Sequence, residues 1–553
     1  MNLSAKPRPY ALAFIAVAGL LAVAMPLLSL DFGITWDDWA QSYYGRLVLR
    51  FFLSGGADRE VMGFKDLYLY GGFFDVVATV IYGAVFDSIH AVAQLQLQDD
   101  LAVAWIFETR HCINALFGFL AILFAGLAAR HLAGWRAGFF AMIFLAISPR
   151  FLGHAMNNPK DIPFAMGYML FLYLLIKFTD QFPRPRISTS VGLAVAIAVT
   201  LGVRIGGVLL LAYLWVFGLW SCYKYRREVS WPRCFVVLGA VTTGGYFGGL
   251  LFWPYGLVSP LIHPWLAMQK MAHFTNAGDT LLFEGRKILA SEIPWYYIPK
   301  WIAISSPILI LLGLILLGAV LIHMFKHLKP TSLTVLLVGS VFPVVWIIVQ
   351  KSQLYNGWRH VLFIYPPLVV LIAAAWDRLF EILKTRNLKI ALCVFLGILC
   401  LEPVAWMMRN HPYQATYFNA LVGDVKGAVG YYETDYWGNS LRACSECLAD
   451  HYRESGMTRP IAVHADGSMM SSFYYLKREL GNRFIPYKPA IRRGLNVPLD
   501  YYIMLPSRWE PSVLQRGGWP PASGFCEARA GGAALCTVFK SPPSGMANPL
   551  SPD

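Results

Sequence analysis

The chain has 553 residues, of which 57% are hydrophobic and only 14% are charged. Soluble domains contain about 25% charged residues, so this composition excludes an ordinary soluble protein and indicates a chain that lies mostly within a membrane. The net charge of +14 does not indicate a nucleic-acid partner, because the basic residues lie in short loops between apolar runs. The sequence contains no nucleic-acid-binding, Walker or dinucleotide-binding motif.

Apolar segments of membrane-spanning character recur along the first 410 residues. They cover residues 10–30, 111–130, 136–149, 162–179, 188–201, 205–221, 234–253, 301–322, 332–350, 360–376 and 390–408. A bilayer core requires about 20 helical residues, and the shorter segments are expected to extend past these limits. The first segment is about twenty residues long, lacks a clear small-x-small cleavage site and precedes many more spans, so we interpret it as a retained helix rather than a signal peptide. The pattern predicts a polytopic α-helical membrane protein with about 11 transmembrane helices.

The distribution of Lys and Arg predicts the orientation of these helices. With the N-terminus in the cytoplasm, the inner loops contain 17 of these residues and the short outer loops contain 5. Residues 67–89 are apolar enough to form another span, but counting them would invert every later loop. We therefore place them in a long outer loop, 31–110, that lies against the membrane. The sequence predicts a bacterial inner-membrane protein whose residues from 410 onward are periplasmic.

Two outer loops contain further predicted structure. Aromatic and aliphatic residues recur at helical spacing from Asp37 to Leu53, which predicts an amphipathic helix at the membrane interface. A second outer loop, 254–300, is interrupted by four prolines and ends in the aromatic run Pro294-Trp295-Tyr296-Tyr297, which suits the headgroup level.

The composition changes after residue 409, which predicts three regions. Residues 1–409 form the transmembrane domain and residues 410–540 a small extracytoplasmic α/β domain, while the Pro- and Ser-rich tail 541–553 is expected to be disordered. Within the α/β domain we expect a helix over 436–452, strands over 460–464 and 501–505, and a hairpin over 525–539 around Gly531-Gly532.

Four of the nine cysteines lie in the predicted outer domain. We expect Cys526 and Cys536 to face each other across the hairpin and to form a disulfide. A zinc site that adds Cys444 and Cys447 is an alternative, but the second pair has the wrong spacing for a zinc ribbon. The remaining cysteines lie in or beside the spans, where we expect inert packing.

Polar residues beside membrane spans indicate function, because burying them there is costly. The candidates on the predicted outer face are Asp37 and Asp38; His154, Asn158, Lys160 and Asp161; Arg204; and Lys351, Tyr355, Arg359 and His360. For the three aspartates, helix capping is an alternative interpretation. The cations are equally consistent with anchoring at lipid headgroups and with binding a phosphate.

Several of these stretches resemble membrane glycosyltransferases of the C-type fold. The resemblance rests on Glu108-Thr109-Arg110-His111, on Gly153-His154 through Asp161-Ile162-Pro163-Phe164, on Tyr355-Asn356-Gly357-Trp358-Arg359-His360, and on the acidic pair Asp37-Asp38 after the first span. It points to the bacterial branch related to dolichyl-phosphate-mannose protein mannosyltransferases and lipid A aminoarabinose transferases, and it covers residues 10–410.

The resemblance implies transfer of a hexosyl or pentosyl group from a polyprenyl-phosphate carrier to an acceptor hydroxyl on a lipid, polysaccharide or protein. Asp37, or its neighbour Asp38, would take the acceptor proton, and Asp161 would orient the acceptor or act with the base. The leaving phosphate would be bound by Arg204, Lys351, Arg359, His360 and Lys160, beside pocket residues His154, Asn158 and Tyr355. Phosphate is a competent leaving group, so no cofactor and no metal are expected.

A transporter or flippase for a lipid-linked substrate is the main alternative. Such a protein requires polar residues deep within its spans, whereas the charges here gather at one surface, and no internal repeat is evident. An assembly protein whose outer domain binds partners is a third interpretation.

Overall fold

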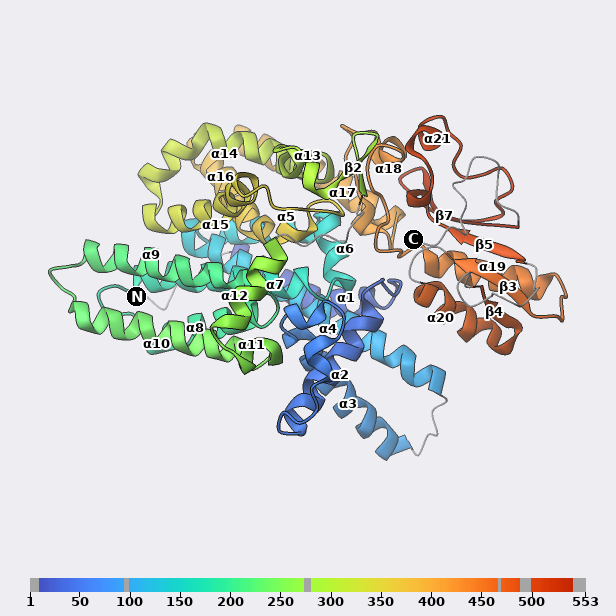
Figure 1. The fold of residues 1–553 in the computed structure, drawn as a ribbon. Coiled ribbons are helices and arrows are strands. Elements are labelled where there is room, and N and C mark those ends of the chain that lie inside the picture. The colour runs from blue at the N-terminus through green and yellow to red at the C-terminus, as the bar shows by residue number, and fades with distance from the viewer. Residues whose placement is uncertain (1–8, 94–98, 273–279, 466–468, 488–498, 541–553) are drawn as a thin grey trace.

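The computed structural model describes residues 9–93, 99–272, 280–465, 469–487 and 499–540. Apolar helices form the larger part of the molecule, and a small sheet with its own helices lies at one end of them (Figure 1). The predicted combination of a polytopic helical part and a small C-terminal α/β part is therefore confirmed. The predicted tail, 541–553, lies outside the described residues.

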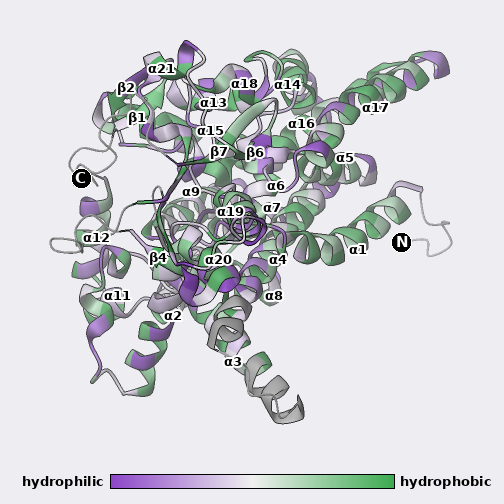
Figure 2. Cartoon of the chain, turned by 90° about the vertical axis from the view of Figure 1, so that its right-hand side faces the viewer, coloured by the Kyte–Doolittle hydropathy of each residue, from purple (hydrophilic) through white to green (hydrophobic). Residues whose placement is uncertain are grey.

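The apolar helices correspond closely to the predicted segments. They are α1 (Pro9–Ser29), α4 (Asp99–Ala133), α5 (Trp135–Ala146), α7 (Asp161–Asp180), α8 (Ile187–Leu201), α9 (Val208–Lys224), α10 (Trp231–Leu250), α14 (Ile308–His327), α15 (Pro330–Val349), α16 (Tyr365–Ile382) and α17 (Arg386–Arg409). Figure 2 shows hydrophobic residues along most of α1 and α17. Leu20 of α1 and Leu401 of α17 are each 65% exposed, as expected of side chains that face lipid rather than water.

The predicted number of spans is not confirmed. Within the described part of the chain, eight helices are long and apolar enough to cross a membrane, or nine if α5 and α6 (Pro149–Asn157), which meet at 69°, form one bent span. Each predicted segment is helical, but α5 has only 12 residues, α8 has 15, and α10 is not among the eight.

The segment after α1 forms the predicted amphipathic helix and a second helix beside it. These are α2 (Asp38–Leu53) and α3 (Phe73–Ala93), joined through the short helices η1 (Glu60–Gly63) and η2 (Leu67–Leu69). Gly71, just before α3, lies so close to Gly202 that a Cβ atom would come within 2.1 Å of the Gly202 carbonyl oxygen. The Phe73 N–H donates to that same oxygen. This contact holds Tyr70 beside the turn that carries Arg204.

The second outer loop contains more structure than its prolines indicate. It forms α11 (Pro254–Val258), α12 (Ile262–Ala272), the hairpin β1 (Thr280–Phe283) and β2 (Arg286–Leu289), and α13 (Tyr297–Ser305). The β1–β2 hairpin was not predicted.

The C-terminal sheet has five strands in the order β4-β3-β5-β7-β6. They are β3 (Ile461–Ala465), β4 (Phe484–Pro486), β5 (Tyr501–Met504), β6 (Cys526–Ala530) and β7 (Ala533–Phe539). Strand β3 is parallel to β4 and β5, while β7 is antiparallel to β5 and β6. The predicted hairpin and strands are confirmed, whereas β4 and the helix α20 (Met469–Leu480) were missed. The predicted helix over 436–452 is α19 (Leu441–Glu454).

The described disulfides differ from the predicted pairing. Cys447 of α19 is bonded to Cys526 of β6. The predicted Cys526–Cys536 bond is wrong because the β6–β7 register places Cys526 opposite Val538 and Cys536 opposite Ala528. A second disulfide joins Cys222 and Cys234, for which only packing was expected.

Candidate active site

Asp161 is the centre of a buried cluster that gathers three separate segments. It is the first residue of α7 and is 3% exposed. An Nη1 atom of Arg204 lies 2.8 Å from its Oδ1, and an Nη1 atom of Arg359 lies 3.6 Å from its Oδ2. The Asn158 side-chain amide donates to Oδ2 at 2.7 Å. Two positive charges, distant in the chain, thus share one carboxylate.

The chain before α7 is shaped to present this carboxylate. The stretch between the predicted spans 136–149 and 162–179 is not a simple connection, because residues 149–157 form α6 and only 158–160 connect it to α7. The Asn158 side-chain oxygen accepts from the Asp161 backbone N–H at 3.1 Å, and its amide reaches His154 Nδ1 at 2.9 Å. An acidic residue in the first turn also interacts favourably with the helix dipole.

Aromatic rings surround the cations. The Arg359 guanidinium lies 5.2 Å from the ring centre of Tyr355 and 5.3 Å from that of Trp437. The Lys160 ammonium lies 4.4 Å from the ring centre of Tyr70, and the Arg204 guanidinium lies 5.7 Å from it. Cations desolvated over rings in this way are held without being neutralised.

Some N–H groups of these cations have no hydrogen-bond acceptor among the described residues. The buried Nε atoms of Arg204 and Arg359 have no hydrogen-bond partner there. Burial lowers the pKa of Lys160, while the carboxylate of Asp37 raises it. An anionic group would complete the contacts of these side chains.

The two acidic residues after α1 have different surroundings. Asp38 is 1% exposed and accepts from the N–H and hydroxyl of Thr35 at 2.8 and 2.9 Å. His111 Nε2 lies 3.4 Å and Arg110 Nε 4.0 Å from its carboxylate. Burial raises the pKa of Asp38, but His111 and Arg110 outweigh that effect and hold the pKa below its usual value. The Asp38 carboxylate is therefore already engaged by Thr35, His111 and Arg110.

The Asp37 side chain makes fewer contacts than that of Asp38, and it lies on the same side of the molecule as Asp161. It is half-buried at the N-cap position of α2, yet its side chain makes no capping hydrogen bond. Burial raises the pKa of Tyr70, Arg204 and Arg359 lower it, and both Asp37 and Asp161 raise it. Both carboxylates thus influence the pKa of Tyr70.

The other predicted residues divide into two groups. His360 lies within electrostatic range of Asp161 and packs against Tyr355 with ring centres 4.6 Å apart. His154 is buried beside Asn158 and also faces the indole N–H of Trp437 at 3.3 Å. Lys351 is exposed at the end of α15, and the described residues show no contact between it and this cluster.

The C-terminal part supplies residues that sequence reasoning missed. Besides Trp437, Tyr436 covers Arg359 at 5.8 Å, and Asn439 accepts from the Asn157 amide at 2.6 Å. Burial raises the pKa of Glu433 to about 7, while Arg359 and the backbone amides of Gly357 and Asn356 act to lower it. No spacing rule relates these positions to residue 359, so no pattern in the sequence points to them.

Across the part of the chain that the structure describes, no group of three or more His, Cys, Asp or Glu side chains has a metal-binding arrangement. The cluster instead combines guanidinium groups, aromatic rings and one unengaged carboxylate. Chemically, this arrangement is able to bind an anion and to accept a proton beside it.

Comparison with known proteins gives one match in sequence and several in structure. No curated protein matches the chain significantly. An ArnT from Cupriavidus metallidurans, solved bound to undecaprenyl phosphate, is 14% identical with a TM-score of 0.46 over 97% of this chain and 99% of that one. An Archaeoglobus fulgidus oligosaccharyltransferase in the apo form is 12% identical with a TM-score of 0.46 over 88% and 69%. Both TM-scores are below 0.5.

The sequence match covers the segment that contains Asp161 and Arg204. Residues 108–245 match the family model for dolichyl-phosphate-mannose-protein mannosyltransferases. This range includes two of the four features on which the predicted resemblance rests, the stretches beginning at Glu108 and at Gly153. In that segment the chain resembles the dolichyl-phosphate-mannose-protein mannosyltransferase family of membrane glycosyltransferases.

Proposed function

We propose that this protein is a glycosyltransferase that moves a sugar from a polyprenyl-phosphate carrier to an acceptor hydroxyl. The observation that carries the proposal is the meeting of Arg204 and Arg359 at Asp161, with Lys160 over the Tyr70 ring and within electrostatic range of the Asp37 carboxylate. The family match over residues 108–245 supports the same reaction class.

The reaction needs one proton acceptor and one site for developing negative charge. The acceptor oxygen attacks the anomeric carbon, and the bond from that carbon to the phosphate oxygen breaks. The acceptor proton passes to Asp37, and the phosphodiester leaves as a phosphate monoester with one additional negative charge. Arg204 and Arg359, held by burial and by aromatic rings, stabilise that charge where it develops.

The ion pairs of Asp161 favour a positioning role for this residue. It fixes both guanidinium groups before the donor binds, so little reorganisation is needed when the phosphate leaves. Lys160, His360 and Tyr355 complete the donor side of the site in this proposal.

The location of the reaction follows from the charge distribution of the loops. The excess of Lys and Arg in the loops opposite to the Asp161 cluster supports a cytoplasmic N-terminus in a bacterial inner membrane. The site and the C-terminal domain would then face the periplasm, where a polyprenyl-linked sugar and an envelope acceptor meet.

The experiment is a comparison of surface glycans and envelope lipids, by mass spectrometry, from cells with the protein, without it, and with Asp37→Asn. Asp58→Asn is the matched control, because this half-buried carboxylate pairs with Arg50 at 2.6 Å and, among the described residues, contacts none of the Asp161 cluster. We expect one glycosylated product to be absent without the protein and with Asp37→Asn, and present with Asp58→Asn. Product that persists with Asp37→Asn would contradict the proposed base, and an unchanged product profile without the protein would contradict the function.

A further inference from the structure

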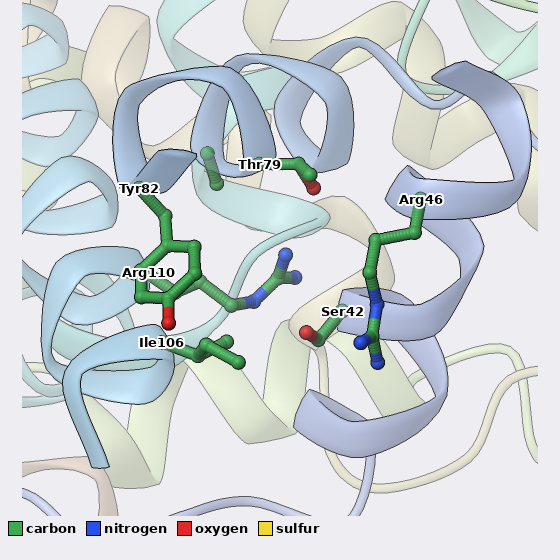
Figure 3. Close-up of a pocket in the computed structure, with 7 residues that line it drawn as sticks. Ser42, Arg46, Thr79, Tyr82, Ile106 and Arg110 are labelled. Atoms are coloured by element: carbon green, nitrogen blue, oxygen red, sulfur yellow. The ribbon is translucent and has the colours of Figure 1, made fainter. Parts of the chain in front are cut away.

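A second cationic cavity lies away from the Asp161 cluster. Helices α2, α3 and α4 enclose a cavity of about 50 Å³ that shares no lining residue with that cluster. Its walls carry Arg46 and Ser42 from α2, Thr79 from α3 and Arg110 from α4. Figure 3 shows the Arg110 side chain extending across this space toward the helix that carries Ser42 and Arg46.

Arg110 supplies a fixed positive group at the inner wall. Its side chain is 2% exposed, and one Nη atom pairs with Asp75 at 2.6 Å. Its buried Nε atom has no hydrogen-bond partner among the described residues and lies 4.0 Å from the carboxylate of Asp38. Burying a guanidinium with an unused N–H is costly, so a ligand that accepts this hydrogen bond would be favoured.

Arg46 supplies a second positive group at the mouth. It is exposed, stacks over the Tyr43 ring at 5.4 Å, and forms no ion pair with any residue that the structure describes. The contrast with Arg50, one turn further along α2, is direct. Arg50 pairs with Asp58 at 2.6 Å and with Glu60 at 3.3 Å. Arg46, unlike Arg50, is therefore not paired with a carboxylate of the described residues and is able to bind an anionic ligand.

The shape and lining of the cavity select the ligand. A cavity of about 50 Å³ has room for a small polar group, since one water needs roughly 10–15 Å³ of such space. Two guanidinium groups and nearby hydroxyls match the oxygens of a phosphate, which accepts several hydrogen bonds at once. The same helices expose apolar side chains, among them Leu53 at 86% and Val80 at 52%, which suits a position at a membrane surface.

We propose that the cavity between α2, α3 and α4 binds a phosphate group carried by a lipid, with Arg110 at its inner wall and Arg46 at its mouth. The site is separate from the donor site proposed above and does not depend on it. Free inorganic phosphate offers the same chemistry, and the experiment distinguishes the two sources.

The test uses the full chain in nanodiscs of phosphatidylcholine with phosphatidylglycerol, released and delipidated stepwise in a native mass spectrometer. We expect one tightly held phosphatidylglycerol, and about a tenfold loss of its occupancy in Arg46→Ala, as for one charge-assisted hydrogen bond. Arg50→Ala, the matched control on the same helix, should retain the lipid. Ser42→Ala should lower the lipid occupancy less than Arg46→Ala does. Because it removes only one hydroxyl, it tests the cavity with little risk of a folding defect.

Inorganic phosphate alone, added to the detergent-solubilised chain, forms the second arm. Displacement of the lipid by millimolar phosphate, in the wild type and not in Arg46→Ala, would uphold the phosphate site and assign it to the free ion. Equal lipid retention in Arg46→Ala and wild type, or equal loss in Arg46→Ala and Arg50→Ala, would overturn the proposal.

Discussion

Exchanging the carboxylates of Asp37 and Asp38 for amides, one at a time, should separate catalysis from folding. The two residues are adjacent, yet Asp37 is half-buried without a capping hydrogen bond while Asp38 is 1% exposed and surrounded by donors. We expect Asp37→Asn to abolish turnover in a stable protein and Asp38→Asn to destabilise the protein.

The magnitudes follow from those surroundings. A general base contributes about 10²–10⁴-fold, which is about 3–5 kcal/mol of transition-state stabilisation. Asp37→Asn should lower the rate by that factor and change the free energy of unfolding by about 0.5 kcal/mol at most, because the half-buried side chain makes no capping hydrogen bond. Asp38→Asn removes the charge opposite Arg110 and His111, and should cost about 3 kcal/mol because a buried pair is broken.

The assay combines thermal unfolding of the purified chain in detergent with release of polyprenyl phosphate from the donor identified by mass spectrometry. Both variants are compared with Asp58→Asn. A turnover within threefold of wild type in Asp37→Asn would refute the assignment of the base. An Asp38→Asn protein that melts with the wild type would refute the structural role of that carboxylate.

Three further outcomes are expected. Arg204→Ala and Arg359→Ala should each lower turnover, measured as release of polyprenyl phosphate, by about 100-fold. A lysine at either position should restore little activity, because it lacks the planar guanidinium group. A loss below threefold would contradict the assignment. Glu433 binds a proton more tightly in the folded protein, where its pKa is about 7, than in the unfolded chain, where it is 4.5. The free energy of unfolding should therefore fall as pH rises from 4.5 to 7, by about 3 kcal/mol at most. Glu433→Gln should make the free energy of unfolding less dependent on pH in that range. Cys447→Ser should remove the bond to Cys526 and cost about 2–4 kcal/mol, and an identical melt in wild type with and without reductant would argue against the disulfide.

The helical part of the fold was predictable because apolar runs are read directly from the sequence. Every predicted span overlaps a helix, although the span 301–322 crosses the break between α13 and α14, and α5 and α8 are shorter than a bilayer requires. The disulfide was mispredicted because its formation depends on the β6–β7 register and on the approach of α19, which no local pattern reveals. The helix α6 was missed because it has only nine residues and carries Arg150, His154 and Asn157, so it does not resemble a membrane span.

Individual residues of the candidate site were predictable from the sequence, but their contacts with one another were not. Asp161, Arg204 and Arg359 were found as charged residues beside spans, which is a costly and therefore informative placement. Their mutual ion pairs were not readable, since they join positions far apart in the chain. The choice between Asp37 and Asp38 required the burial of each side chain, and Trp437 required the path of the chain after α17.

The contacts of the segment from Glu433 to Asn439 have a practical consequence for protein engineering. This segment belongs to the C-terminal part, yet its indole faces His154, its rings cover Arg359 and its amide oxygen meets Asn157. A chimera that exchanges everything after residue 409 would remove that cover and leave a guanidinium open to water. Domain swaps intended to change acceptor preference should therefore keep residues 433–439 with the helical part.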